Sequence, residues 1–320
     1  MIVRRGLDRL PEVLAEAGIE RPFLIASDRW AGLDLPAGER WSEIPSDRID
    51  KVAARAEGAD GLLAVGGGSA IDLAKAVSSA TGLPLVSVPT TYSGSEWTEF
   101  FGIRDPDRRM KGGGAGAHPV GIVYEPELLL GLPRAESGGT ALNALAHCAE
   151  ALYVTGRNAE GDKHALEGAN LIGESLPAVL ENGEDTEARR KLLEGAMHGG
   201  AAMAAAGLGL GHAMAQTLGG RFGIPHGAAN ALSLPPALRF NEPVAATEIA
   251  RFGEALGSAA PVVRVEELAR LSGYERLRDL GVPEDELDEV AEATAVRAGA
   301  KANPRPASPA EIAELLRSIY

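Results

Sequence analysis

The chain has little of what marks a secreted or membrane-bound protein. Cys148 is the single cysteine among 320 residues, so no disulfide can form within the chain, and a reducing compartment suits this composition. The basic N-terminus, Met1 to Arg5, is not followed by an apolar signal core, and no run of 18 apolar residues is long enough to span a membrane. We therefore expect a cytoplasmic protein that does not contact a membrane.

Basic residues are also scarce. The chain carries 31 Lys and Arg against 45 Asp and Glu, which gives a formal net charge of −14 at pH 7. A surface that binds duplex nucleic acid needs a basic patch, so this balance argues against a nucleic-acid partner. It does not argue against a small anionic ligand, because one local Lys or Arg is enough to bind it.

The apolar sequence is sufficient for a large core, since 45% of the residues are hydrophobic. Up to about residue 132, short apolar runs alternate with helical patterns, which predicts a parallel sheet with helices on its faces. We expect strands at 22–27, 61–65, 84–88 and 121–124 and helices at 7–17, 50–57 and 71–80.

The most informative stretch is an apolar run that ends in glycines. Leu62 to Val65 is followed by Gly66, Gly67, Gly68 and Ser69, and a helical pattern starts at once. Glycines let a backbone approach a ligand closely, and a helix N-terminus favours a phosphate or pyrophosphate group. The alternative is a tight turn with no ligand.

The second part of the chain is expected to be helical. After Leu132 and Pro133 strand patterns almost disappear, so we place a domain boundary between residues 1–132 and 133–320. Just before it, the glycine-rich segment 112–116 is predicted to be an irregular surface loop or a mobile lid. The expected helices cover 139–155, 161–180, 186–206, 228–238, 245–257, 284–298 and 308–318.

Three histidines of the helical part are candidates for chemistry. His147 follows Asn143 by four residues, which places both on one face of a helix, while His212 and His226 lie near expected helix starts. Neutral imidazoles are good ligands for zinc or ferrous iron. The alternative is that these are ordinary surface or core histidines.

Polar residues also gather where the expected strands end. Asp28 follows the first expected strand, where a carboxylate can accept hydrogen bonds from a ribose 2′-hydroxyl, although it is equally suited to a loop. Lys75 and Lys111 could neutralise a phosphate or a carboxylate, or simply be solvated. The polar run Thr90 to Ser95 follows another strand and could bind a nucleotide or build turns.

Taken together, the motifs at 60–76, 88–96, 124–128 and 303–306 resemble the iron-containing (group III) alcohol dehydrogenase superfamily over nearly the whole chain. The spacing of the histidines, 65 positions from His147 to His212 and 14 more to His226, is also close to that of the family. Within the superfamily, the segments 142–153 and 218–226 and the Pro-Thr-Thr-Tyr-Ser-Gly-Ser-Glu motif are similar to the maleylacetate reductase type.

The resemblance implies a dehydroquinate synthase-like architecture, with a Rossmann-like α/β domain at 1–132, a helical substrate and metal-site domain at 133–320, and a cleft between them. It implies a homodimer and NAD(H) rather than NADP(H), a choice that Asp28 favours. The residues that it implies for the cofactor are Gly67, Gly68 and Ser69 for the pyrophosphate and Thr90, Thr91, Ser95, Thr98 and Lys111 along the cofactor cleft.

For the chemistry the resemblance implies His147, His212 and His226, with Asn143 completing a metal-ligand set for Fe²⁺ or Zn²⁺ or for no metal at all. Asn143 stands where the superfamily has an aspartate, and an amide is a weaker ligand than a carboxylate. Gln216 stands where most members have a histidine, and an amide cannot relay a proton as imidazole does. The first strand region also resembles a trimmed version of the family pattern.

The function implied is reduction of maleylacetate, or of a similar small oxo or unsaturated acid, by hydride from NADH. Arg221 and Lys111 are candidates to hold the substrate carboxylates. Three alternatives stay open: a generic metal-dependent alcohol or aldehyde dehydrogenase, a dehydroquinate synthase-like lyase, and a protein that binds the cofactor without catalysis.

Overall fold

The computed structural model describes every residue from Met1 to Tyr320 and divides the chain into two compact units. The first unit is Met1–Leu129 and the second is Leu130–Tyr320. No helix in either unit combines the length and the hydrophobicity that a membrane crossing requires.

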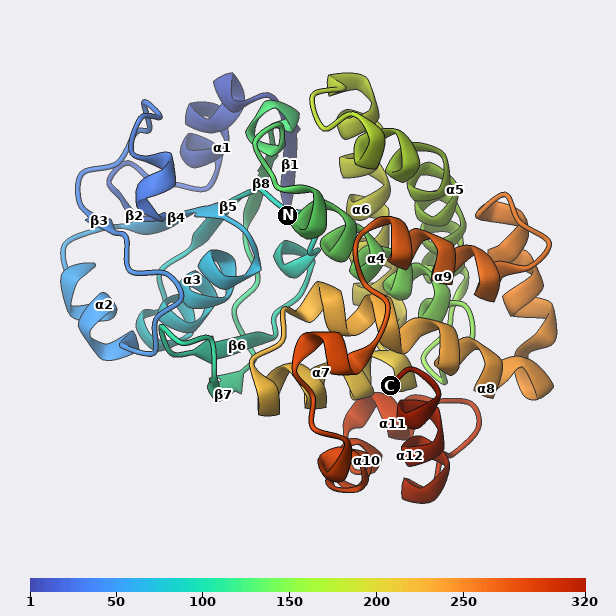
Figure 1. Cartoon of the computed structure of the whole chain (residues 1–320). Helices are drawn as coiled ribbons and strands as arrows, with labels where there is room; N and C mark the ends of the chain where they lie inside the picture. The colour runs from blue at the N-terminus through green and yellow to red at the C-terminus, as the bar shows by residue number, and fades with distance from the viewer. The chain divides into compact units, whose positions relative to one another are not determined.

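The first unit contains a six-stranded parallel sheet, visible in Figure 1. The four expected strands are confirmed, and two further strands, β1 and β3, form its edges. β3 is only two residues long and β1 follows the start of the chain, so neither gives a clear sequence pattern. In spatial order the strands are β1 (Ile2–Arg5), β8 (Gly121–Tyr124), β5 (Leu85–Pro89), β4 (Gly61–Gly66), β2 (Pro22–Ile25) and β3 (Arg40–Trp41).

Helices cover both faces of this sheet. Consecutive strand residues point to opposite sides, and because they are apolar, both faces must be buried. Leu63 and Val86 share a hydrophobic cluster with Val13 on one face, while Leu62 packs with Ile71 on the other. The expected helices are confirmed as α1 (Leu10–Glu16), α2 (Ile49–Arg55) and α3 (Gly68–Thr81). The short 3₁₀ segments of this unit are η1 (Leu7–Arg9), η2 (Asp28–Trp30), η3 (Ser95–Trp97) and η4 (Pro126–Leu129).

The glycine-rich segment 112–116 corrects the sequence prediction. Gly112 to Gly114 belong to β7 (Met110–Gly114), which pairs antiparallel with β6 (Phe101–Arg104) in a separate hairpin. Glycine is depleted in strands, so the sequence pointed to a loop. Here the missing side chain has a use, because a Cβ on Gly113 would lie 2.8 Å from the carbonyl oxygen of Phe101.

The second unit is entirely helical, and α4 is buried along most of its length against α5, α6 and α8. Small residues allow this close packing, since a Cβ on Gly199 would lie 2.7 Å from the carbonyl oxygen of Ala144. The predicted fold class is therefore confirmed. The helices are α4 (Arg134–Ala151), α5 (Ala159–Glu181), α6 (Thr186–Ala206), α7 (Leu210–Phe222), α8 (His226–Ala255), α9 (Pro261–Leu271), α10 (Leu287–Ala295), α11 (Ala298–Ala302) and α12 (Pro309–Ser318), with 3₁₀ segments η5 (Leu277–Leu280) and η6 (Glu284–Glu286).

Two details of the helical unit differ from the sequence prediction. The segments 228–238 and 245–257 are one helix, α8, which is kinked at Ala245 with φ −136° and ψ 29°. Pro243 lies just before the kink and removes a backbone donor from the helix. Helix α7 was expected only as a helix start near His212, because its three glycines obscure the periodicity. Helix α9 was not expected, although it contains no glycine.

Candidate active site

The glycine turn joins β4 to α3 at the carboxyl edge of the sheet. Gly67 is the N-cap of α3, and no side chain caps the helix there. The first-turn N–H groups are thus not used by a capping side chain, which suits a bound anion. A Cβ on Gly67 would lie 2.8 Å from the methyl group of Thr91, so a larger residue would push the turn away from the next loop.

The loop after β5 carries four of the predicted cofactor residues. Its first residue, Thr90, donates its backbone N–H to the carbonyl oxygen of Gly66 (3.0 Å), which ties the loop to the glycine turn. Thr91 has a buried hydroxyl with no hydrogen-bond partner. Ser95 and Thr98 follow in and beside η3. The structure therefore brings this loop and the glycine turn together, as the sequence predicted for parallel neighbouring strands.

Asp28 and Lys111 are placed differently from each other. Asp28 follows β2, at the same edge of the sheet as the glycine turn, and its side chain is 85% exposed. The guanidinium of Arg40 lies 3.9 Å from its carboxylate. Lys111 lies on the exposed strand β7 and pairs with Asp105 at 3.1 Å, so its ammonium group is already engaged within the hairpin.

Lys75 does not face a ligand, which corrects the idea that it neutralises a phosphate. Its side chain is completely buried, and its ammonium group donates to the carbonyl oxygens of Ser95 (2.9 Å), Thr98 (3.4 Å) and Phe100. It also pairs with Asp72 at 3.2 Å. The sequence shows the charge but not these distant main-chain acceptors.

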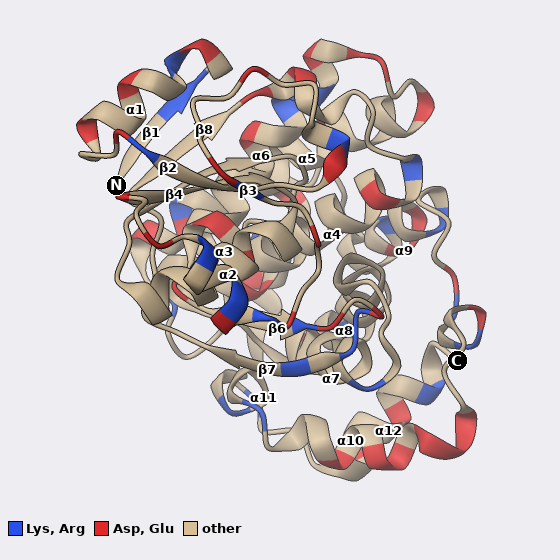
Figure 2. Ribbon diagram, turned by 90° about the vertical axis from the view of Figure 1, so that its left-hand side faces the viewer, with Lys and Arg blue, Asp and Glu red and all other residues tan.

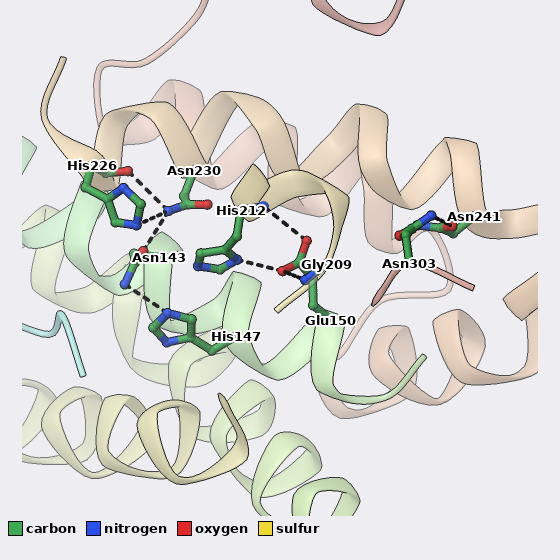
Figure 3. A network of polar contacts seen from close by, with 9 residues as sticks. All are labelled: Asn143, His147, Glu150, Gly209, His212, His226, Asn230, Asn241 and Asn303. Carbon is green, nitrogen blue, oxygen red and sulfur yellow. Dashed lines mark hydrogen bonds and ion pairs between the residues drawn. The ribbon is translucent and has the colours of Figure 1, made fainter. Parts of the chain in front are cut away.

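The second unit brings the three candidate histidines together from three helices, as Figure 3 shows. His147 comes from α4, His212 from α7 and His226 from α8. The rings of His147 and His212 stack with centroids 4.7 Å apart, and those of His212 and His226 are 5.9 Å apart. We call Asn143 and these three residues the histidine cluster.

Glu150 orients His212 and was missed by the sequence reasoning. Its buried carboxylate accepts from Nδ1 of His212 (2.7 Å) and from the backbone N–H groups of Gly209 (2.7 Å) and His212 (3.2 Å). The carboxylate thereby holds the start of α7 and fixes one ring nitrogen. A signal was present in the sequence, because Glu150 follows His147 by three residues on the same helix face.

Asn230 links two members of the histidine cluster, Asn143 and His226, and was also missed. Its amide nitrogen donates to the Asn143 oxygen (2.7 Å) and lies 3.1 Å from Nε2 of His226. The Asn143 amide nitrogen in turn lies 3.4 Å from Nε2 of His147. Asn230 follows His226 by four residues, a helical spacing that places both on one face. Figure 3 shows this continuous chain of imidazoles and amides.

Some buried polar atoms of the histidine cluster and of Asn230 have no hydrogen-bond partner within the protein. They are Nδ1 of His147, Nε2 of His212 and Oδ1 of Asn230. Buried polar atoms are nearly always hydrogen-bonded, so these are the atoms through which a ligand or water would be recognised. Burial and the neighbouring rings of His212 and His226 hold the pKa of His147 well below its usual range, which keeps this ring neutral.

Two models of one protein family match this chain, one in each unit. The model of the Fe-containing alcohol dehydrogenase family, C-terminal, matches residues 138–320, and the model of iron-containing alcohol dehydrogenase matches residues 39–123. The chain belongs to the iron-containing alcohol dehydrogenase family. It is therefore an oxidoreductase.

Within this family, the chain is similar to maleylacetate reductases. It is 37% identical to the maleylacetate reductase of Burkholderia cepacia over 97% of this chain and 87% of that protein. The structure of maleylacetate reductase from Agrobacterium tumefaciens is 30% identical, with a TM-score of 0.88 over 100% of this chain and 95% of that one. The iron-containing alcohol dehydrogenase of Corynebacterium glutamicum is 29% identical, with a TM-score of 0.89 over 100% and 94% of the two chains.

The family name implies iron, but the histidine cluster of this chain does not fit a divalent metal. No group of three or more His, Cys, Asp or Glu side chains is arranged to hold an ion. Asn143 offers an uncharged amide where a metal would gain from a carboxylate, and Nε2 of His147 and of His226 already face the amides of Asn143 and Asn230. The cluster is a group of imidazoles and amides in which Glu150 orients His212.

Two further predicted residues lie outside this network. Gln216 lies one turn after His212 on α7, half-buried, and its amide forms no hydrogen bond with the cluster. Arg221, a candidate for the substrate carboxylates, instead pairs with Glu286 (2.5 Å) and Glu289. These acidic residues belong to the acid-rich segment η6–α10, visible in Figure 2, so Arg221 is not free for a substrate.

Proposed function

We propose that this family member reduces maleylacetate, or a closely similar small oxo acid with an activated double bond, with NADH as the hydride donor. The observation that carries the proposal is Asn143, which stands where the family resemblance implies a metal ligand and contacts His147 directly and His226 through Asn230. The similarity to proteins named maleylacetate reductase supports the choice of substrate.

The first unit would bind the cofactor. Gly67, Gly68 and Ser69 would receive the pyrophosphate at the uncapped start of α3, where N–H groups and the helix dipole favour negative charge. Asp28 would accept hydrogen bonds from the adenosine ribose and would repel a 2′-phosphate, which favours NADH over NADPH. The buried, unpartnered hydroxyl of Thr91 would donate to the part of the cofactor between the pyrophosphate and the nicotinamide ring.

The second unit would supply the polar groups for the reaction. Hydride addition to a carbon of the substrate leaves negative charge on the conjugated carbonyl oxygen, and a proton must then reach the other carbon. Imidazole groups placed beside the developing charge stabilise it and can deliver a proton. Glu150 would hold His212 in a fixed orientation for this task. Gln216 lacks the chemistry of a proton relay, so we assign it no proton transfer.

The test is NADH oxidation by the purified protein with maleylacetate, compared with simple alcohols and NAD⁺. We expect one NADH consumed for each maleylacetate reduced, with a kcat/KM at least about a hundredfold above that for any simple alcohol. Comparable or higher efficiency with alcohols would favour the generic alcohol dehydrogenase reading, which the similarity to the Corynebacterium glutamicum enzyme supports. Binding of NADH without turnover of either substrate would contradict the proposed reaction.

We also propose, on the family resemblance alone, that the protein is a cytoplasmic homodimer that binds a small carboxylic acid and neither nucleic acid nor a membrane. Light scattering coupled to size-exclusion chromatography measures the mass directly. A mass near twice the 33.2 kDa of the chain is the expected result, and a monomer would contradict it.

A further inference from the structure

The loop between β5 and β6 has little regular structure to hold its shape. Its internal backbone hydrogen bonds are few: Trp97 donates to Gly94 (3.1 Å) and Thr98 to Ser95 (3.4 Å) around the single turn of η3. A loop of this kind would be mobile unless other elements fix it. Tyr124 of β8 contacts the middle of the loop, where it accepts from Nε1 of Trp97 (2.7 Å) and donates to Oε1 of Glu96 (2.9 Å). The groups that hold Ser95 and the end of the loop come from α3.

Lys75 is the first of these groups. It lies two turns into α3 with no exposed surface, and its ammonium group contacts three loop carbonyl oxygens, those of Ser95, Thr98 and Phe100. A buried charge is strongly unfavourable unless it is paired and hydrogen-bonded. Here the three N–H donors meet the loop carbonyls and the carboxylate of Asp72, so the charge is satisfied only while the loop keeps this shape.

Asp72 is the second group, one turn before Lys75 on the same helix. Its carboxylate accepts from the Ser95 hydroxyl (2.5 Å) through one oxygen and from the Gly102 backbone N–H (3.1 Å) through the other. Ser95 is therefore held twice, by its side chain through Asp72 and by its carbonyl through Lys75. The pair fastens the loop at Ser95 and at the start of β6.

The order of the strands indicates which part of a bound dinucleotide this loop would contact. β2, β4 and β5 are neighbours in the parallel sheet, so Asp28, the glycine turn and the loop after β5 follow one another along its carboxyl edge. With the adenosine ribose at Asp28 and the pyrophosphate at the glycine turn, the next portion of a dinucleotide is the nicotinamide riboside. That portion would reach the loop.

We propose that Asp72 and Lys75 are positioning residues for the nicotinamide half of the cofactor. They touch neither the cofactor nor the substrate. They hold the loop of Ser95 and Thr98 at a fixed place relative to α3, whose first turn would bind the pyrophosphate. This inference rests on the proposed use of NADH by the first unit, and it adds a role for two residues that the function alone does not require.

The test compares two nucleotides on the whole protein. ADP contains the adenosine and pyrophosphate parts of NADH but not the nicotinamide riboside. The variant Lys75→Met removes the ammonium group and keeps a long apolar side chain, and Lys51→Met, on the exposed surface of α2, is the matched control. Dissociation constants for NADH and ADP are measured by calorimetry, and circular dichroism checks that each variant is folded.

For Lys75→Met we expect the NADH dissociation constant to rise about tenfold or more, since charge-assisted hydrogen bonds to the loop are lost, while that of ADP changes less than about threefold. The control should change neither. Equal losses for NADH and ADP would overturn the proposal, because the pair would then support the unit as a whole. Unchanged NADH binding by the folded variant would overturn it as well.

A milder variant decides the question if Lys75→Met does not fold. Asp72→Asn keeps the size of the side chain, which is 26% exposed, and removes its charge. The same selective loss for NADH is expected, about threefold to tenfold. A nonselective effect, or none, contradicts the proposal.

These measurements need no turnover, so they separate two failures. Wild-type protein that binds NADH and ADP but does not reduce maleylacetate would refute the proposed reaction and leave the positioning result valid. Wild-type protein that binds neither nucleotide would refute both.

Discussion

The two units hold their polar groups in opposite ways. In the first unit, the charged side chains of Asp72 and Lys75 form hydrogen bonds with the backbone of an irregular loop and of the strand after it. In the second unit, imidazoles and amides contact one another, and the carboxylate of Glu150 orients one of them, His212. Helices already fix the backbone of the second unit, so neutral side-chain contacts suffice there, whereas a loop without regular structure needs stronger charge-assisted bonds.

If the two units divide the work in this way, a substitution in the histidine cluster should lower kcat without weakening the binding of NADH. For His212→Gln we expect kcat to fall about 10²–10⁴-fold, the usual contribution of a positioned acid–base group. The NADH dissociation constant should stay within about twofold of the wild-type value. Steady-state kinetics and calorimetry measure both, with the exposed His118→Gln as the control. A parallel loss of NADH affinity would show that the two regions do not divide the work.

Glu150→Gln tests the orienting group by itself. The amide offers one acceptor where three N–H groups now converge on a carboxylate, so we expect the free energy of unfolding to fall by about 2–3 kcal/mol. As His212 loses its fixed orientation, kcat should fall about tenfold or more. Urea unfolding and kinetics are compared with Glu254→Gln on the exposed side of α8. A stability loss with unchanged kcat would make Glu150 a purely structural residue.

Asp28→Ala probes the far end of the cofactor. Removing the exposed carboxylate, with Arg40 left nearby, should raise kcat/KM for NADPH relative to NADH by about tenfold. The value of kcat with saturating NADH should not change. Asp34→Ala, another exposed carboxylate, serves as the comparison. An unchanged cofactor ratio would remove Asp28 from the nucleotide site.

A buried carboxyl within the loop between β5 and β6, that of Glu96, predicts a pH effect on stability. Burial raises the pKa of Glu96 above its usual value, although its Oε1 accepts the Tyr124 hydroxyl at 2.9 Å. Between the unfolded and the raised folded pKa, the folded state binds more protons, so stability is lost as the pH rises through that window. Glu96→Gln should remove this loss, which amounts to at most about 1.4 kcal/mol for each pH unit inside the window.

Thermal unfolding between pH 5 and pH 9 measures this effect, with Glu57→Gln on the surface as the control. The stability of Glu96→Gln relative to wild type should rise with pH. A constant difference across this range would mean that Glu96 stays ionised in the folded protein.

The sequence predicts contiguous motifs in both units, but it does not predict contacts between distant segments. The glycine turn and the strands before and after it are contiguous, so local patterns predicted β4, α3 and the following loop. Lys75 lies inside that motif, yet its partners are main-chain carbonyls 20 or more residues away, which no side-chain pattern reveals. The β6–β7 hairpin was not predicted, because the glycines of β7 do not form a strand pattern in the sequence.

In the helical unit, the spacing of His147, His212 and His226 suggested a cluster only through the family resemblance. Glu150 and Asn230 were missed although each lies on the same helix face as a candidate histidine. Their roles depend on contacts between helices, such as the 2.7 Å bond from Asn230 to Asn143, 87 residues apart in the chain. Periodicity places such residues on a face but does not say which helix that face meets.

We expect this family member to work through imidazoles and amides at the place where the family name implies a metal. Exhaustive chelation of the purified enzyme, followed by metal analysis and the maleylacetate assay, tests it most directly. We predict less than about 0.1 metal ion per chain and full NADH oxidation, because the neutral donors of the cluster hold a divalent ion weakly. Loss of activity on chelation, restored by stoichiometric Fe²⁺ or Zn²⁺, would show that the histidine cluster holds a catalytic metal.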